Sequence, residues 1–382
     1  MVTQLGYDAA DRPAWMKYPG SPAEQVTYTY NPRGLLKTVV GSATYVGNTF
    51  YNALGQVTGR YLGSPTGVVR QAYTYTAAEN FRLTALTSGT SPNYNNRQNL
   101  SFTYDDAGNV WTITDAAAYG GAQTQSFSYD ALNRLLTAQA SGDPNYGAYS
   151  QRSYAYSNAG NITSFENLGT FSYNDAAHKH AVTHLNSVQK FWYDANGNAT
   201  RRINPAGIDI SLTYDQENRL ITVSGNRTAS YTYDGDGVLV KAVDSSNNIT
   251  TVVVGPHYEV RNTTPRKYYY AGSVRVAMRD NGTLYWLLTD HLGSTNLTLD
   301  SSGNRLDPNA ELRYKPYGDT RYNGGGQKTN YRPSIGLRMY FTGQRWDQGH
   351  GLYWFNSRWY DPLSGGSCRR IRSCRSRGIR RR

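Results

Sequence analysis

A short pattern of aromatic, polar and apolar positions recurs along most of the chain. It reads aromatic, any residue, Tyr, a small polar residue, two variable residues, Gly or Asn, and an apolar residue two positions later. Clear copies occupy 28–36, 102–110, 127–135, 154–162, 191–199, 212–220 and 231–239, and looser copies occupy 5–13, 49–57, 73–81 and 171–179. Since strand side chains alternate between faces, the two rings lie on one face, and the pattern predicts short antiparallel hairpins.

The polar positions of the pattern predict the turns. The residue after the Tyr is Asp, Asn, Ser or Thr in every copy, and these side chains accept hydrogen bonds from turn N–H groups. Four residues after the Tyr the chain needs a left-handed conformation, which Gly and Asn tolerate best. Two copies have Glu79 and Ala177 there, so their turns should differ. The predicted turn residues are Gly34, Gly55, Gly108, Asn133, Gly160, Gly197, Asn218 and Gly237.

Composition agrees with an all-β class. The chain has 34 Tyr and 38 Gly among 382 residues, and it has no long helical pattern. An aromatic stripe at strand spacing mostly packs across strands, so we interpret the tyrosines as scaffold. A sugar-stacking surface formed by some of the rings is the alternative.

Three longer motifs extend the pattern into the last third of the chain: "YWLLTDHLGSTNLTLDSSGN" (285–304), "LRYKPYGDTR" (312–321) and "YFTGQRWDQGHGLYWFNSRWYDP" (340–362). Together with the repeats they resemble the bacterial RHS/YD-repeat proteins. We therefore expect a YD-repeat array at 1–245 and an RHS repeat-associated core at 246–366. The resemblance implies hairpins that wind into an open spiral or shell-like curved sheet, with the core as a β cap.

The resemblance also implies a function. In the family the shell surrounds a variable C-terminal polypeptide, often a toxin used between competing cells, so we expect an effector polypeptide as the partner. Cell-surface carbohydrate binding is the alternative, with glycans as partners. Secretion or a cell-surface location is expected from the family. Core-motif positions carried over as structural residues are Asp290, His291, Gly293, Ser294, Tyr314, Pro316, Gly318, Thr342, Gly343, Gln344, Gly351, Leu352, Tyr353, Arg358, Tyr360, Asp361 and Pro362.

Candidate catalytic and metal-binding groups have simpler interpretations. Asp290, His291 and Ser294 lie within five residues, whereas catalytic triads assemble from residues distant in sequence, so turn chemistry is the better account. A zinc site at His178, His180 and His184 has no acidic or thiolate partner nearby, which favours a loop with exposed histidines. We expect no enzymatic activity, no cofactor and no metal.

The C-terminal end departs from the rest of the chain. Residues 367–382 contain eight arginines and both cysteines, and without these arginines the net charge falls from +12 to +4. In the family, a Gly-Arg-Phe stretch is expected after "DPLS". If one cytosine is deleted from a possible set of codons for that stretch, the reading frame shifts and encodes the Gly-Gly-Ser-Cys found at 365–368. We therefore expect a frameshifted, disordered tail and a chain that is a fragment. The alternative is a polyanion-binding arm, although nucleic acid is not the expected partner.

Targeting signals give little guidance. We expect no membrane span, because the sequence has no run of about 18 apolar residues. The first residues also lack the charged and apolar regions of a signal peptide.

Overall fold

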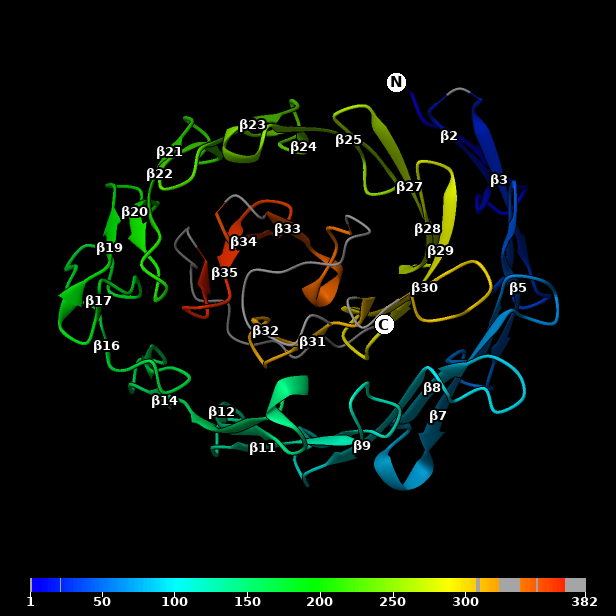
Figure 1. Ribbon diagram of the computed structural model, residues 1–382, viewed down its shortest axis with the longest axis horizontal. Coiled ribbons are helices and arrows are strands. Elements are labelled where there is room, and N and C mark those ends of the chain that lie inside the picture. Colours follow the sequence, from blue (N-terminus) through cyan, green and yellow to red (C-terminus); the bar gives the residue numbers. More distant parts are fainter. Residues whose placement is uncertain (1, 21, 307–309, 323–336, 348–349, 368–382) are drawn as a thin grey trace. The chain divides into compact units, whose positions relative to one another are not determined.

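The computed structural model describes residues 2–20, 22–306, 310–322, 337–347 and 350–367. The arginine-rich segment lies outside these residues from 368 onward. The chain divides into two compact units, each made of two segments. The first unit consists of residues 1–151 and 251–344, and the second consists of residues 152–250 and 345–382. Each unit thus combines part of the repeat array with part of the predicted core. The described chain is almost entirely antiparallel β-structure (Figure 1), which confirms the all-β class.

The first unit begins with a sheet of 13 strands in which each strand pairs with the next (Figure 1). The strands are β1 (Gln4–Tyr7), β2 (Pro13–Tyr18), β3 (Glu24–Tyr30), β4 (Leu36–Val40), β5 (Thr44–Tyr51), β6 (Val57–Leu62), β7 (Val69–Thr76), β8 (Arg82–Gly89), β9 (Gln98–Tyr104), β10 (Val110–Asp115), β11 (Gln123–Tyr129), β12 (Leu135–Ala140) and β13 (Tyr149–Ser153).

A second run of strands in this unit covers the start of the first. It consists of β25 (Ile249–Val254), β26 (Tyr258–Arg261), β27 (Thr264–Ala271), β28 (Val274–Asp280), β29 (Thr283–Thr289) and β30 (Thr295–Leu299). Strand β27 contacts β4, and β28 contacts β5. The core between them includes Tyr18, Val39, Tyr45, Leu62, Tyr269, Ala277, Trp286 and Leu297, all buried. The short hairpin of β31 (Arg313–Tyr314) and β32 (Thr320–Tyr322) follows.

The second unit contains the shorter hairpins of the array. Its strands are β14 (Ala155–Tyr156), β15 (Ile162–Ser164), β16 (Phe171–Ser172), β17 (His184–Leu185), β18 (Val188–Gln189), β19 (Phe191–Tyr193), β20 (Ala199–Ile203), β21 (Asp209–Tyr214), β22 (Leu220–Gly225), β23 (Ala229–Tyr233) and β24 (Leu239–Asp244). Four late strands complete it: β33 (Arg345–Asp347), β34 (Leu352–Trp354), β35 (Trp359–Asp361) and β36 (Gly366–Ser367). Leu352, Trp354 and Trp359 pack against the array residues Ile210, Leu220 and Tyr231.

Short 3-10 helices occupy some connections: η1 (Ala77–Glu79), η2 (Pro144–Tyr146), η3 (Ser245–Asn247) and η5 (Phe341–Gly343). η1 replaces the standard turn at Glu79, and Asn80 takes the left-handed position instead, with φ of 52°. At Ala177 the N–H bonds to the Asp175 side chain at 2.9 Å, and φ is not in the positive range. Both turns therefore differ, as the departures from the repeat pattern predicted.

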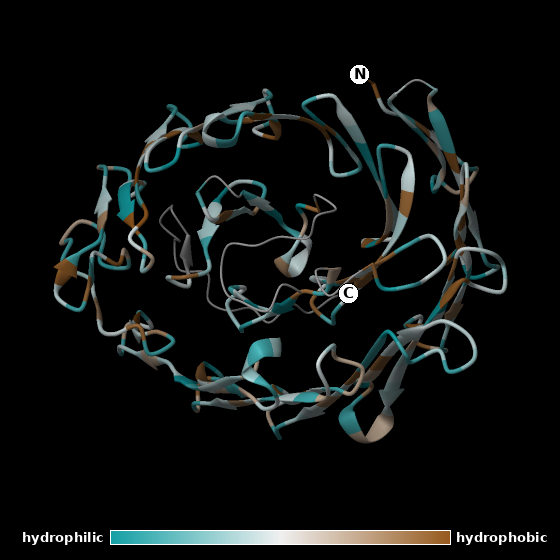
Figure 2. Cartoon of the chain, viewed as in Figure 1, coloured by the Kyte–Doolittle hydropathy of each residue, from teal (hydrophilic) through white to brown (hydrophobic). Residues whose placement is uncertain are grey.

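Alternating burial explains why these sequences form strands. Strand β21 alternates between buried and more exposed side chains from Ile210 onward, and Figure 2 shows hydrophobic and hydrophilic residues interleaved along the strands. The pairing register slips by one residue next to the repeat Tyr: Thr213 pairs with Thr222, but Tyr214 pairs with Leu220. The extra residue is a β-bulge, which bends and twists the hairpin. In the described part of the chain, no helix is long and apolar enough to cross a membrane.

Candidate functional site

Most of the repeat turns are held by the polar residue that follows the Tyr. Asp130 shows the arrangement: its Oδ1 accepts hydrogen bonds from the N–H groups of Leu132 and Arg134, both at 2.9 Å. These backbone bonds and the Arg134 guanidinium lower the pKa of the Asp130 carboxyl. The eight turn residues named from the sequence all have positive φ, namely Gly34 (76°), Gly55 (79°), Gly108 (86°), Asn133 (59°), Gly160 (82°), Gly197 (80°), Asn218 (61°) and Gly237 (80°).

The repeat tyrosines do more than pack their rings. In eight hairpins the hydroxyl donates a hydrogen bond of 2.6–3.0 Å to a backbone carbonyl of the preceding hairpin, at or near the start of its returning strand. We call this series the tyrosine ladder. Its donor and acceptor pairs are Tyr30–Pro13, Tyr51–Leu36, Tyr104–Leu83, Tyr129–Val110, Tyr173–Ile162, Tyr193–Val182, Tyr214–Ala199 and Tyr233–Leu220. The ladder connects successive repeats through side chains, and sequence reasoning did not foresee these bonds.

The segment Asp290–Ser294 forms one more turn of the repeat type. Oδ1 of Asp290 accepts hydrogen bonds from the N–H groups of Leu292 and Ser294, both at 2.9 Å, and Gly293 has φ of 81°. The hydroxyl of Ser294 accepts a hydrogen bond from the N–H of Thr342 at 3.0 Å, while the His291 ring lies 4.9 Å from the Phe102 ring. The three side chains thus have separate partners, which agrees with turn chemistry.

The first unit brings three distant core motifs together. The Tyr314 hydroxyl donates to the Thr295 carbonyl at 2.9 Å, and the Thr295 hydroxyl donates to the Met339 carbonyl at 2.7 Å. Pro316 and Gly318 lie in a turn closed by a bond from the Gly318 N–H to the Lys315 carbonyl. Thr342 and Gly343 have positive φ of 49° and 71°, and Gln344 ends their turn. The motif residues of this unit therefore form backbone turns and supports.

The remaining motif positions lie in the second unit. Gly351 has φ of 71°, Leu352 and Tyr353 are buried, and the Tyr360 ring contacts the Phe355 ring at 5.4 Å. The carbonyl of Arg358 accepts a bond from the Phe355 N–H at 2.8 Å. Asp361, followed by the buried Pro362, forms an ion pair with the Nε of Arg202 at 2.9 Å, and both side chains are 2% exposed. This pair joins the last described strands to β20.

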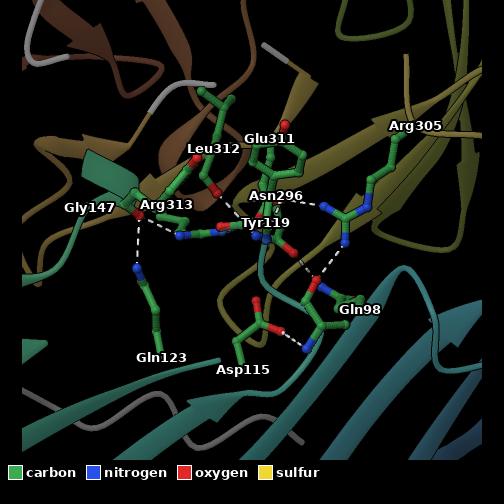
Figure 3. Close-up of polar contacts among 12 residues, drawn as sticks. Gln98, Asp115, Tyr119, Gln123, Gly147, Asn296, Arg305, Glu311, Leu312 and Arg313 are labelled. Atoms are coloured by element: carbon green, nitrogen blue, oxygen red, sulfur yellow. Dashed lines mark hydrogen bonds and ion pairs between the residues drawn. The ribbon is translucent and has the colours of Figure 1, made fainter. Parts of the chain in front are cut away.

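A buried polar network joins Asn296, Arg305, Glu311 and Arg313 to β9 and to the loop at 117–119, as Figure 3 shows. Arg313 donates to the Tyr119 carbonyl at 2.7 Å and pairs with Glu311 at 2.7 Å. Glu311 also pairs with Arg305, which donates to the Ala117 carbonyl at 2.6 Å. A buried ion pair needs further hydrogen bonds to offset its desolvation, and these backbone carbonyls provide them.

Amide side chains and two further charged groups, Asp115 and Arg321, complete the network. Gln98 donates to Asn296 Oδ1 at 3.0 Å, and Arg321 donates to Gln123 Oε1 at 2.7 Å. Burial and the nearby Glu311 raise the pKa of Asp115 to about 6, whereas burial and Arg313 lower the pKa of Arg321 to about 10. The sequence offered only a weak signal for this site, since Arg313 and Arg321 flank the "YKPYGD" motif.

The histidines at 178–184 need a correction. His178 is only 6% exposed, and its Nδ1 lies 2.8 Å from a carboxylate oxygen of Asp175, so it is neither exposed nor without an acidic neighbour. His180 bonds to Asn161 Oδ1 at 2.7 Å, and His184 lies in β17 beside the Thr183 hydroxyl. His178 also lies against the next hairpin, with its Nε2 3.3 Å from the Ala195 carbonyl, a contact that the local sequence did not reveal. Among the described residues no cluster of three or more His, Cys, Asp and Glu could hold a metal ion.

Comparisons with known proteins agree with this architecture. The family model described as Teneurin YD-shell matches residues 91–366. The tRNA3(Ser)-specific nuclease WapA of Bacillus spizizenii is 25% identical over 272 residues, which are 70% of this chain and 9% of that protein. The tRNA nuclease WapA of Bacillus subtilis is 24% identical over 275 residues, with the same coverage. The chain thus spans 9% of the length of these curated relatives.

Solved structures show the same fold. The crystal structure of TcdB2-TccC3-Cdc42 matches with a TM-score of 0.78 and 20% identity, over 96% of this chain and 20% of that one. The Photorhabdus luminescens Tc holotoxin pore matches with a TM-score of 0.77 and 19% identity, over the same shares.

Proposed function

Because the chain belongs to the Teneurin YD-shell family, we propose that it is a non-enzymatic wall segment of a shell that encloses and delivers a C-terminal effector polypeptide. The division into an array at 1–245 and a core at 246–366 is part of this proposal, as are secretion and a role in intercellular competition. Cell-surface carbohydrate binding is not favoured by these similarities.

One observation carries the proposal. The late segments fold back onto the repeats within each unit: Arg313 binds carbonyls beside β10 and β11, and Asp361 pairs with Arg202 of β20. The side chains of Arg313, Asp361 and Arg202 are all buried, so these contacts fix the course of the late segments up to the last described strands. A polypeptide attached after these late segments would therefore start beside the same sheet.

The tyrosine ladder supplies the mechanical part of the argument. A sheet that encloses another polypeptide must resist slippage between hairpins, and the ladder bonds add to the backbone pairing that joins the strands of neighbouring hairpins. Each ladder bond spans two hairpins and ties a side chain to the neighbouring backbone. Within each unit, the ladder therefore supports a wall that needs no catalytic group.

A fusion experiment tests the proposal. An unstructured reporter of about 60 residues, carrying one protease site, is attached after Ser367 in one protein and before Val2 in a second. We expect the C-terminal reporter to be cut at least tenfold more slowly than the N-terminal one. In a third protein, the C-terminal reporter is fused to the Arg313→Met variant, and it should be cut faster than the same reporter on the parent chain. Equal cutting rates in the first two proteins would refute enclosure.

A further inference from the structure

A cavity of about 350 Å³ lies in the first unit beside the network of Figure 3. Strands β9–β12 form one wall, and the segments 290–292 and 312–317 with Phe341 form the other. Its volume falls in the range of about 300–1,000 Å³ typical of pockets that take small ligands. Neither the repeat turns nor the ladder account for it.

The walls of the cavity are mainly apolar. Leu100, Ile113, Phe127, Leu135 and Phe341 line it, and the first three come from three adjacent strands. Ile113 of β10 and Gln125 of β11 are directly paired, so both side chains lie on the face that lines the cavity. The next pair, Thr112 and Ser126, lies on the opposite face because strand side chains alternate.

Each charged side chain of the lining has at least one polar partner, although two buried nitrogens of the lining, Nδ1 of His291 and Nε of Arg321, have no hydrogen-bond partner among the described residues. The two carboxylates accept hydrogen bonds from backbone N–H groups: Asp115 from Ala117 at 3.1 Å and Asp290 from Ser294 at 2.9 Å. The three cations bind side chains, each at 2.7 Å: Arg313 binds Glu311, Lys315 binds Asp319, and Arg321 binds Gln123. A charged ligand would lose hydration and would compete with these partners. An uncharged apolar group would disturb none of them and would remove apolar wall from water.

We propose that this cavity binds large uncharged side chains, aromatic or branched aliphatic, of the polypeptide that the chain encloses. That the ligand comes from an enclosed polypeptide rests on the proposed function. That the ligand is uncharged and apolar rests on the residues that line the cavity. An unfolded polypeptide exposes such side chains, so the cavity provides an anchoring point that depends on side-chain type and not on a particular sequence.

The binding test uses the full chain and N-phenyl-1-naphthylamine, an uncharged aromatic probe whose fluorescence rises in apolar surroundings. Gln125→Trp and Ile113→Trp fill the cavity, while Ser126→Trp and Thr112→Trp place the same ring on the opposite face of the sheet, at the adjacent pair of positions. We expect at least tenfold weaker probe binding in the two filled variants and less than twofold change in the two controls. Thermal unfolding of each variant identifies any loss of fold.

Competition identifies the ligand class. A capped peptide Gly-Phe-Leu-Gly should displace the probe, and a capped Gly-Asp-Lys-Gly should not. No probe binding to the parent chain, equal losses in filled and control variants that both remain folded, or equal displacement by the two peptides would each overturn the proposal.

The reporter fusion separates this inference from the proposed function. If the C-terminal reporter is unprotected but the probe still binds and Gln125→Trp abolishes the binding, enclosure fails and the cavity's specificity stands. If the reporter is protected equally in the parent and in Gln125→Trp, enclosure stands and the anchoring role fails.

Discussion

Removing one hydroxyl from the tyrosine ladder gives the sharpest test of what connects the repeats. In Tyr104→Phe the ring stays, but the 2.6 Å bond from the hydroxyl to the Leu83 carbonyl is lost. Burial raises the pKa of the Tyr104 hydroxyl, which agrees with a group that has little water to replace its partner. A typical intramolecular hydrogen bond contributes about 0.5–1.5 kcal/mol net.

The expected loss for Tyr104→Phe is therefore about 1 kcal/mol in the free energy of unfolding. The triple variant at Tyr51, Tyr104 and Tyr129 removes bonds of 2.6, 2.6 and 2.8 Å on separate hairpins. If the three effects add, the loss is about 1.5–4.5 kcal/mol. Urea unfolding followed by circular dichroism measures both values.

Tyr7→Phe is the matched control. Tyr7 belongs to the first repeat of the described chain and is 59% exposed, so loss of its hydroxyl should leave the unfolding free energy unchanged within about 0.5 kcal/mol. If Tyr104→Phe and the triple variant are no less stable than Tyr7→Phe, the ladder does not stabilise the repeats and the reasoning is wrong.

Three further predictions test other parts of the structure. Arg313→Met should destabilise the first unit by about 3 kcal/mol or more, because Glu311 loses a buried partner; urea unfolding checks this, and a loss below about 1 kcal/mol would contradict it. Burial alone would raise the pKa of Glu24, but hydrogen bonds from Tyr45 and Tyr269 outweigh it and lower the pKa to about 2 from an ordinary 4.5. The stability that Glu24 contributes is thus full above pH 4.5 and is lost as the pH falls towards 2. Over this pH range, the melting temperature should therefore fall less in Glu24→Gln than in the parent. Gly160→Ala should cost roughly 1 kcal/mol, because φ is 82° and no atom lies within 4 Å of the new Cβ, so backbone strain alone acts; Gly160→Asn should cost less in the same melts, and equal costs would count against the strain argument.

Local chemistry made much of this fold predictable. The hairpins, their turns and the left-handed residues follow from contacts within about nine residues, so a pattern such as "LTYDQENRL" contains the information for them. Asp290–Ser294 could be interpreted as a turn for the same reason. The core-motif residues were named from resemblance, and their contacts came only with the structure.

The sequence by itself determined the all-β class, the repeat period and the turn chemistry, because these depend on the alternation of side chains and on the residues that tolerate positive φ. Tertiary structure decided the partners of the tyrosine hydroxyls, the burial of His178, and the assembly of Glu311, Arg313 and Arg321 against β11 and the loop at Tyr119. These contacts join residues up to about 200 positions apart, and no local pattern records which distant carbonyl or carboxylate will face a given side chain. The candidate site belongs to this second group, because desolvated charges find their partners only when the sheets have packed.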